Sequence, residues 1–483
     1  MTANSGQDRE GAAPRDGHGA APPAGSLWRA AVDAIRGTQE DFTSGSLNRG
    51  VLLLAIPMVL EMAGESLFVV VDAYFVSGLG ASALAALALT ESMLAVIYSI
   101  AVGLAMSTTA MVARRTGEKD KRGAARAAVQ AILLAVGIAG VLGLTGALLA
   151  PWLLRIMGGD PEVVAVGTTF ARIQMGGMVV IILLFVNNAI YRGAGDATMA
   201  MRSVWLANGI NIVLDPCLIL GLWIFPELGL TGAAVATTTG RGIGALYQLW
   251  HMSRGDRIRV KREDVVADLA VVRRLARVSL GGIGQMLVTQ ASYIASIRIL
   301  SEFGTVALAG YLLAIRVVIF IILPAWGLAN AAATLVGQNL GAGKPERAEQ
   351  AVYLTGTWNM LFMGVVTVVF VWFPDLILSP FATDPETNAV GVRALRIISY
   401  GYIFYAWGMV MMQAFNGAGD TATPTWINIG VFWFFQLPLA AVLAFPLGIR
   451  ENGVFASLAI AYSLSAVVGF TLFRRGRWKK KVL

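Results

Sequence analysis

Residues 51–76 constrain the fold most, because this stretch holds no lysine or arginine and only three charged residues. A helix needs about 20 apolar residues to cross the ~30 Å hydrocarbon core of a bilayer, so the stretch predicts a membrane-spanning helix. At ~100° per residue, its three acids, Glu61, Glu65 and Asp72, share one narrow face. An ionisable group in a membrane helix is unfavourable unless it faces protein or water, so all three are functional candidates. The alternative is that Glu61 or Glu65 only hydrogen-bonds to a neighbouring helix.

The rest of the chain has a similar composition. Of its 483 residues, 57% are hydrophobic and 14% are charged, against about 25% charged in soluble domains. Eleven further apolar segments follow the first, which predicts an all-α polytopic membrane protein with twelve transmembrane helices. The predicted spans lie at about residues 51–76, 86–112, 124–149, 164–190, 199–223, 229–252, 272–300, 306–336, 348–373, 390–415, 423–445 and 453–473.

Several classes of function lack support in the sequence. The single cysteine, Cys217, excludes an intrachain disulfide and a cysteine-cluster metal site, and two histidines do not predict a histidine-built metal site. The net charge of +8 comes from lysines and arginines in short loops and at the C-terminus, which argues against a nucleic-acid partner. The glycine-rich turns follow no strand and carry no P-loop lysine, and no catalytic triad is present. We therefore expect no enzyme activity and no cofactor other than a coupling ion.

Basic residues gather on one side of the predicted topology. They lie in the loop after the second span, in the central link and at the C-terminus, whereas the opposite side is nearly bare. By the positive-inside pattern, both termini and the link are cytoplasmic, and we expect a plasma (inner) membrane location. Residues 1–45 are predicted to be a disordered cytoplasmic tail, which contains a short amphipathic piece at 27–35. An amino-terminal lobe (46–252), a cytoplasmic linker (253–271), a carboxy-terminal lobe (272–474) and a basic tail (475–483) follow.

The two lobes are predicted to be repeats, because short sequences recur at a constant offset of 224 residues. The sequence Gly-Ala-Gly-Asp at residues 193–196 recurs at 417–420, and Asp-Pro at 160–161 recurs at 384–385. Six spans per repeat give both lobes the same topology. They should therefore be related by an axis along the membrane normal, with a central cleft between them.

Four polar residues of the amino-terminal lobe are predicted to lie at a similar depth. Asp72 lies ~33 Å along the first span and Asp215 ~24 Å along the fifth, both in the outer half. Asn211 is one turn from Asp215, and Thr237 lies ~12 Å below the outer end of the sixth span. Two carboxylates, an amide and a hydroxyl form an all-oxygen site suited to a hard cation such as Na⁺. The same acids could carry H⁺ instead, because burial beside a like charge favours one protonated carboxyl.

A second set of candidates concerns the substrate and a proton path. Glu61 and Glu65 lie nearer mid-membrane, where a cationic substrate could bind, and Arg316 of the eighth span is predicted to pair with one of them if it faces the cleft. Glu91 opens the second span on the outer side, where it is either solvated or part of the coupling. Aromatic faces attract organic cations and methionines adapt to varied ligands, although ordinary packing explains such residues in the tenth span equally well. These tenth-span candidates are Tyr400, Tyr405, Met409 and Met412.

Several short motifs occur in order along the chain. They are Pro57 followed by Val71-Asp72, the Gly-Ala-Gly-Asp turn used twice, Asn211-x-x-x-Asp215-Pro216, and Gly-Ala-Ala-Val-Ala-Thr at residues 232–237. With the duplication, they make residues 47–473 resemble the multidrug and toxic compound extrusion (MATE) family. The resemblance implies an antiporter that exports organic, often cationic compounds, driven by inward flow of Na⁺ or H⁺. The family's amino-lobe cation site, carried over by motif, falls on Asp72, Asn211, Asp215 and Thr237.

The carboxy-terminal lobe lacks the acids that one branch of this family carries there. The repeat register sets Ser296 opposite Asp72 and Leu439 opposite Asp215, so coupling is expected in the amino-terminal lobe, as in the DinF-like branch. We predict a monomeric secondary transporter in membrane lipid, with alternating access, for small organic, cationic or amphipathic substrates. A flippase for lipid-linked saccharides is the alternative of similar architecture, and a channel or receptor is the alternative of another class.

Overall fold

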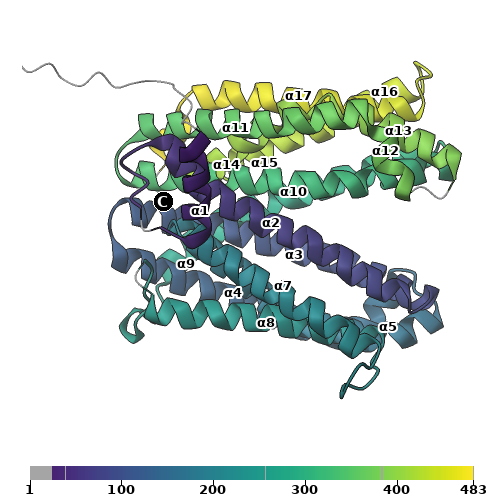
Figure 1. Ribbon diagram of the computed structural model, residues 1–483, viewed down its shortest axis with the longest axis horizontal. Coiled ribbons are helices and arrows are strands. Elements are labelled where there is room, and N and C mark those ends of the chain that lie inside the picture. The colour runs from purple at the N-terminus through teal and green to yellow at the C-terminus, as the bar shows by residue number, and fades with distance from the viewer. Residues whose placement is uncertain (1–23, 39, 256, 382–383, 482–483) are drawn as a thin grey trace, which may run out of the picture.

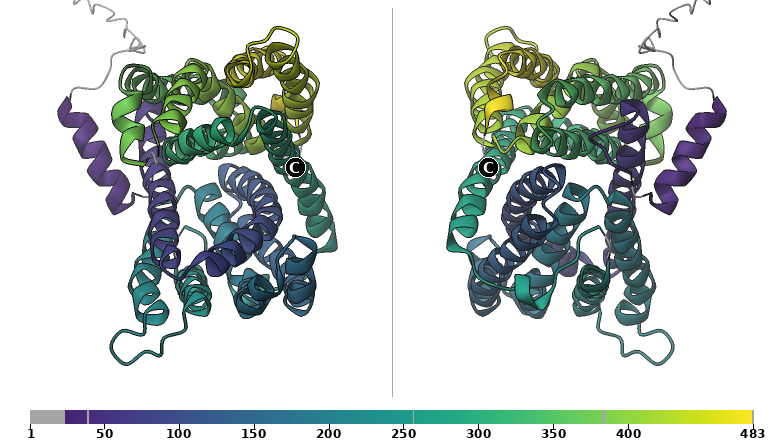
Figure 2. Two further views of the ribbon diagram at one scale, coloured as in Figure 1. Left: turned by 90° about the vertical axis from the view of Figure 1, so that its right-hand side faces the viewer. Right: turned by 90° about the vertical axis from the view of Figure 1, so that its left-hand side faces the viewer.

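Helices in two lobes make up the structure, a computed structural model that describes residues 24–38, 40–255, 257–381 and 384–481. The lobes lie one above the other in Figure 1 and are seen along their helices in Figure 2. The N-lobe contains α2 (Leu47–Ser77), α3 (Ala81–Gly117), α4 (Lys121–Ile156), α5 (Pro161–Gly176), α6 (Met178–Gly193), α7 (Ala197–Ile219) and α8 (Leu230–Arg254). The C-lobe contains α9 (Leu269–Ser301), α10 (Thr305–Gly341), α11 (Pro345–Trp372), α12 (Pro374–Leu378), η2 (Ser379–Phe381), α13 (Pro385–Ser399), α14 (Tyr402–Gly417), α15 (Ala422–Asn428), η3 (Ile429–Gln436), α16 (Leu437–Ala444) and α17 (Glu451–Arg474).

Each of the twelve predicted spans lies on a helix or on a run of consecutive helices. Eight helical segments are long and apolar enough to cross a membrane, among them the continuous runs α5–α6 and α15–η3–α16. The other four spans form α7, α8, α9 and the pair α13–α14. No described residue belongs to a β-strand. The all-α polytopic fold is therefore confirmed.

The two lobes repeat each other in local detail. The fourth span breaks at Gly177 between α5 and α6, and the tenth breaks at Tyr400 and Gly401 between α13 and α14. Asp160 caps α5 and Asp384 caps α13, each by accepting a hydrogen bond from a backbone N–H of the first turn. Gly177 and Gly401, like the two aspartates, are 224 residues apart. The predicted duplication therefore extends to helix caps and helix breaks.

The sequence offset between equivalent residues of the two lobes falls from 224 to 221 near the end of the chain. Gly229 precedes α8 with φ 54° and ψ −132°, and Arg450 precedes α17 with φ 56° and ψ −139°. These equivalent positions are 221 residues apart, so the C-lobe is three residues shorter in this region. The side chain that bonds to Ser296 is Gln436, at the end of the π-helical segment η3. The prediction of Leu439 as the counterpart of Asp215 is therefore wrong, and Gln436 takes that place.

The basic end of the molecule is the end where the lysine- and arginine-rich loops lie. There α1 (Ala24–Arg36) packs beside α2 and α7, and Arg49 of α2 makes ion pairs with Asp33 at 2.9 Å and Glu40 at 2.7 Å. The prediction of a disordered tail over residues 1–45 is wrong for α1, because these contacts tie the amphipathic helix to the N-lobe. Residues 1–23 lie outside the described part of the chain.

The linker between the lobes also lies at the basic end. It contains η1 (Arg262–Asp264) and joins α8 to α9. The side chain of Gln130 on α4 donates to the carbonyl oxygen of Val266 at 2.6 Å and accepts from the backbone N–H of Asp268 at 3.0 Å. After α17, η4 (Arg477–Lys480) ends the described chain with Trp478 fully buried. Both segments are therefore packed onto the helices.

Glycines let the lobes approach each other closely. A Cβ atom on Gly327 of α10 would lie 2.5 Å from the carbonyl oxygen of Met58 on α2. Nearer the basic end, a Cβ on Gly117 of α3 would lie 1.9 Å from the carbonyl oxygen of Gln338 on α10. Only glycine permits such contact between helix backbones. In Figure 1 the ribbons of the two lobes diverge from this end toward the end that carries α5 and α12.

Candidate functional site

Three predicted residues contact one another in the N-lobe, and a fourth lies within electrostatic range of them. Asn211 and Asp215 lie one turn apart on α7, Thr237 faces them from α8, and Asp72 lies on α2. The amide Nδ2 of Asn211 donates to Oδ1 of Asp215 at 3.2 Å and to Oγ1 of Thr237 at 3.3 Å. Asp72 lies close enough to Asp215 for the two carboxylates to repel each other. We call these four residues the N-lobe cluster.

Glycines of α8 position this cluster. A Cβ on Gly232 would lie 2.4 Å from the carbonyl oxygen of Leu218, and one on Gly240 would lie 2.5 Å from that of Ala207. Because both glycines lack a side chain, α8 and α7 pack backbone against backbone. The short side chain of Thr237, between the two glycines in sequence, therefore reaches Asn211 on α7.

Three buried oxygen atoms of the N-lobe cluster lack a hydrogen-bond partner among the described residues. Asn211, Asp215 and Thr237 are at most 5% exposed. Oδ1 of Asp72, Oδ1 of Asn211 and Oδ2 of Asp215 are buried and accept no hydrogen bond from the described residues. An unsatisfied buried polar atom costs about 1–3 kcal/mol, so these atoms are suited to a bound cation or proton. No group of three or more His, Cys, Asp or Glu side chains that could hold a metal ion occurs in the described parts of the chain.

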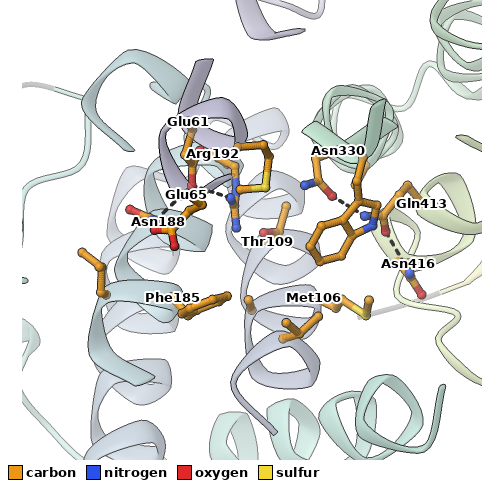
Figure 3. Close-up of a pocket in the computed structure, with 16 residues that line it drawn as sticks. Glu61, Glu65, Met106, Thr109, Phe185, Asn188, Arg192, Asn330, Gln413 and Asn416 are labelled. Atoms are coloured by element: carbon orange, nitrogen blue, oxygen red, sulfur yellow. Dashed lines mark hydrogen bonds and ion pairs between the residues drawn. The ribbon is translucent and has the colours of Figure 1, made fainter. Parts of the chain in front are cut away.

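A pocket between the lobes contains the other two acids of α2 (Figure 3). Oε1 of Glu61 accepts a hydrogen bond from Nη1 of Arg192 at 2.8 Å and from Nδ2 of Asn188 at 3.0 Å. The side chain of Glu61 is 1% exposed and that of Arg192 is 10% exposed. Glu65 pairs with Arg241 at 3.4 Å. Each glutamate of this interlobe pocket therefore has an arginine of the same lobe as its partner.

Neutral amides form the opposite wall of the interlobe pocket. The side chain of Gln413 on α14 bonds to Asn330 on α10, and Asn416 donates to Oε1 of Gln413 at 2.9 Å. Figure 3 shows these amides across the pocket from the Glu61–Arg192 pair. The pocket thus has a charged N-lobe wall and a neutral C-lobe wall.

Interlobe hydrogen bonds join the lobes on the basic-end side of this pocket. Oγ1 of Thr334 donates to the carbonyl oxygen of Arg192 at 3.1 Å, and Nε2 of Gln338 donates to that of Gly193 at 2.9 Å. Thr334 and Gln338 follow the pocket residue Asn330 along α10 toward the basic end. The end of α6 and the last turns of α10 therefore hold the lobes together there.

The family model MatE matches residues 57–217 and, a second time, residues 283–442. The chain belongs to the MatE family. The double match confirms the predicted duplication, and the family confirms the resemblance to MATE transporters. The probable multidrug resistance protein YoeA of Bacillus subtilis is 27% identical over 445 residues, which cover 90% of this chain and 95% of YoeA. The probable multidrug resistance protein NorM of Thermotoga maritima is 25% identical over 440 residues, which cover 90% of this chain and 94% of NorM.

Solved structures agree with the MatE assignment. The crystal structure of MATE in complex with MaL6 superposes with a TM-score of 0.86 at 26% identity. It covers 92% of this chain and 100% of that chain. The likeness therefore extends over both lobes. This MatE protein is a multi-pass membrane protein of a transporter family.

One predicted contact of this MatE protein is wrong. Arg316 is exposed on α10 and pairs with neither Glu61 nor Glu65, because Arg192 and Arg241 of the N-lobe already neutralise these acids. Arg241 is buried against the Phe68 ring, 5.0 Å from its centre, and pairs with Glu65 on α2. The sequence interpretation missed Arg192, which directly precedes the Gly-Ala-Gly-Asp turn. The available signal was a basic residue just after the predicted span at residues 164–190.

The remaining candidates of the MatE protein fall in different places. Glu91 lies within α3, about three turns after its start, and within electrostatic range of Asp72. Tyr405, Met409 and Met412 line a cavity inside the C-lobe. Tyr400 lies at the break before α14, is 58% exposed and does not line that cavity.

Proposed function

We propose that this MatE protein exports small organic compounds, organic cations among them, by antiport with Na⁺ or H⁺. The observation that carries the proposal is the N-lobe cluster, where two carboxylates lie within electrostatic range of each other and one oxygen each of Asp72, Asn211 and Asp215 is buried without a hydrogen-bond donor. Such a site binds a cation more favourably than it remains unliganded. The names of YoeA and NorM as probable multidrug resistance proteins support efflux. The acids of the N-lobe cluster also favour assignment to the DinF-like branch. We further propose that the protein acts as a monomer.

Orientation in the membrane is part of the proposal. Lysines and arginines concentrate at the basic end, which supports a cytoplasmic location for this end and for both chain termini in the plasma (inner) membrane. The interlobe bonds of Thr334 and Gln338 close the basic end. In the proposed cycle this is the state that faces outward, in which the ion binds and the substrate leaves.

Helix α2 is the proposed connection between ion and substrate. It carries Asp72 in the N-lobe cluster, Glu61 and Glu65 in the interlobe pocket, and Met58 against Gly327 of the C-lobe. Pro57 removes one helical hydrogen bond, so α2 can bend near this contact. A cation that reduces the repulsion between Asp72 and Asp215 therefore changes how α2 packs against α7. The ion drives transport only because it binds the two states of α2 with different affinity.

The experiment is efflux of ethidium from everted membrane vesicles under an imposed gradient of either Na⁺ or H⁺. We expect one ion to drive transport and expect Asp72→Asn and Asp215→Asn each to reduce it at least about tenfold, which is ~1.4 kcal/mol of coupling free energy. Glu227→Gln, in the exposed loop before α8, is the matched acid-to-amide control and should transport normally. Continued pumping by both aspartate variants would overturn the coupling site. Correct insertion without movement of any organic cation would favour the lipid flippase.

A further inference from the structure

The C-lobe contains a cavity of about 540 Å³. It lies among α9, α10, α14, η3 and α17, inside one lobe rather than between the two. Pockets that bind drug-sized molecules have volumes of roughly 300–1,000 Å³, so this cavity has the size of a ligand site. We call it the C-lobe cavity.

The lining of the C-lobe cavity is aromatic, sulfur-containing and uncharged. Tyr405 and Tyr462 stack with ring centres 4.1 Å apart and present aromatic surface to the cavity. Met409 and Met412 follow Tyr405 along α14 at helical spacing. None of the described residues that line this cavity is charged. A ligand with a localised charge would therefore lose its hydration without gaining a counter-ion.

The polar part of the lining is the neutral counterpart of the N-lobe cluster. Gln436 replaces Asp215, and Ser296 replaces Asp72 in the repeat register. The amide Nε2 of Gln436 donates to Oγ of Ser296 at 3.3 Å and to Oγ of Ser457 at 3.2 Å. The position that binds a cation in our proposal for the N-lobe therefore holds a neutral hydrogen-bonded group in the C-lobe.

One buried polar atom of the described lining lacks a hydrogen-bond partner. Gln285 of α9 is 5% exposed and lines the cavity, and its Oε1 accepts no hydrogen bond from the described residues. A buried carbonyl oxygen of this kind is satisfied when a ligand presents an N–H or O–H group. The atom therefore specifies a hydrogen-bond donor on the ligand.

The cavity adjoins the interlobe pocket. Trp326 and Gln413 line both of them, and Figure 3 shows Gln413 on the C-lobe wall of the interlobe pocket. A ligand in the C-lobe cavity thus lies next to the proposed transport path, on the side away from Glu61 and Arg192.

We propose that the C-lobe cavity binds flat aromatic molecules that carry no net charge and one hydrogen-bond donor. Tyr405 and Tyr462 supply the stacking surface, the methionines adapt to the ring edges, and Oε1 of Gln285 accepts the donor. The protein then has separate sites for the coupling ion and for an uncharged substrate. The inference builds on the proposed efflux function, but binding to this cavity does not depend on ion coupling.

Acridone is the probe, because it is flat, fluorescent and neutral and has one ring N–H. Binding is measured by fluorescence titration of the purified full-length protein in lipid nanodiscs, with empty nanodiscs as the blank. 10-Methylacridone lacks the donor, and acridone-10-acetate adds a carboxylate at the same nitrogen. We expect acridone to bind about fivefold more tightly than 10-methylacridone, because one hydrogen bond to a buried acceptor is gained. We expect acridone-10-acetate not to bind.

The variants separate stacking from hydrogen bonding. Tyr405→Ala should weaken binding of both neutral probes about tenfold, since a stacking surface is lost, and Tyr405→Phe should restore it. Gln285→Leu should remove the difference between acridone and 10-methylacridone. Tyr400→Ala, in the same span but outside the cavity, should bind acridone like the wild type.

The contrary results are equally specific. Unchanged acridone affinity in Tyr405→Ala, tight binding of acridone-10-acetate, or loss of acridone binding in Tyr400→Ala would each overturn the proposal. Failure of ion-driven ethidium efflux with acridone binding intact would contradict the proposed function alone.

Discussion

The three acids of α2 share one face of the helix but have different neighbours. Glu61 is fully buried and bonds to Arg192 and Asn188. Glu65 is partly exposed, and its pair with Arg241 is longer. Asp72 has no basic hydrogen-bond partner among the described residues and lies near Asp215. The glutamates therefore stabilise the N-lobe in this state, whereas Asp72 remains available to an ion.

Glu61→Gln should destabilise the protein more than Glu65→Gln. The amide removes the negative charge and leaves the buried guanidinium of Arg192 without a counter-ion, which costs about 3–5 kcal/mol. Glu65→Gln breaks a longer pair of 3.4 Å, and the guanidinium of Arg241 keeps its contacts with the Phe68 and Tyr98 rings, so the loss should be smaller. Thermal unfolding in detergent measures both. Equal melting temperatures for the two variants would contradict the assigned difference in burial.

The sequence predicted the positions of individual residues along their helices better than it predicted the ion pairs between helices. The helical period placed Asn211 one turn from Asp215, and the span depths brought both near Asp72 and Thr237. Ion pairs between helices depend on rotation and tilt, which a hydropathy pattern does not contain. For this reason Arg192 was missed, and the conditional pairing of Arg316 with Glu61 or Glu65 is not realised.

The residues that precede α8 and α17 show that equivalent positions of the repeat keep one backbone conformation while their residue types differ. Gly229 and Arg450 adopt the same positive φ, yet only the first is a glycine. A side chain in this conformation clashes with its own backbone, and ψ near −135° makes the region still less favourable for an L-residue. The constant 224-residue offset, predicted from recurring motifs, also holds for the helix caps and breaks of the two lobes up to Asp420. It failed at Gln436 because a three-residue deletion within a helical span leaves the apolar pattern unchanged.

Arg450→Gly should stabilise the C-lobe by about 1 kcal/mol, because the backbone strain that it removes outweighs the loss of the Glu451 ion pair at 3.4 Å and of the contact with the Phe303 ring. Gly229→Ala is the reciprocal variant and should destabilise by about 1–3 kcal/mol. A Cβ at Gly229 has its nearest neighbour 4.0 Å away, so any effect reports the backbone and not a clash. Differential scanning fluorimetry of both variants provides the measurement. A lower melting temperature for Arg450→Gly would show that the side-chain contacts of Arg450 stabilise the protein by more than its backbone strain destabilises it.

At the scale of the whole molecule, the two lobes have diverged in chemistry while keeping one fold. The described part of the N-lobe buries Glu61, Asp215 and Arg241, and the C-lobe counterparts of its cation cluster are neutral. The sequence predicted two lobes, their shared topology and the acidic N-lobe. It did not predict which ends of the lobes meet, because contacts such as Gly117 against Gln338 depend on a rigid-body angle between lobes.

Gly117→Ala tests whether this contact holds the basic end closed. Its new Cβ would lie 1.9 Å from the carbonyl oxygen of Gln338, and overpacking of this kind costs about 1–3 kcal/mol. If the clash is relieved by separation of the lobes, the equilibrium shifts about tenfold or more toward a state open at the basic end. Spin labels at Arg126→Cys and Gln350→Cys, both exposed near that end, report the separation in a Cys217→Ser background.

We expect the label distance to lengthen in Gly117→Ala and to stay unchanged in Gly137→Ala, where a Cβ on α4 meets no atom within 4 Å. Added Na⁺ or acid should then return part of the population toward the short distance, because in our proposal the coupling ion favours the state closed at the basic end. A folded Gly117→Ala protein with the wild-type distance would show that the lobes absorb the methyl group locally. The closed end would then depend on the Thr334 and Gln338 hydrogen bonds instead.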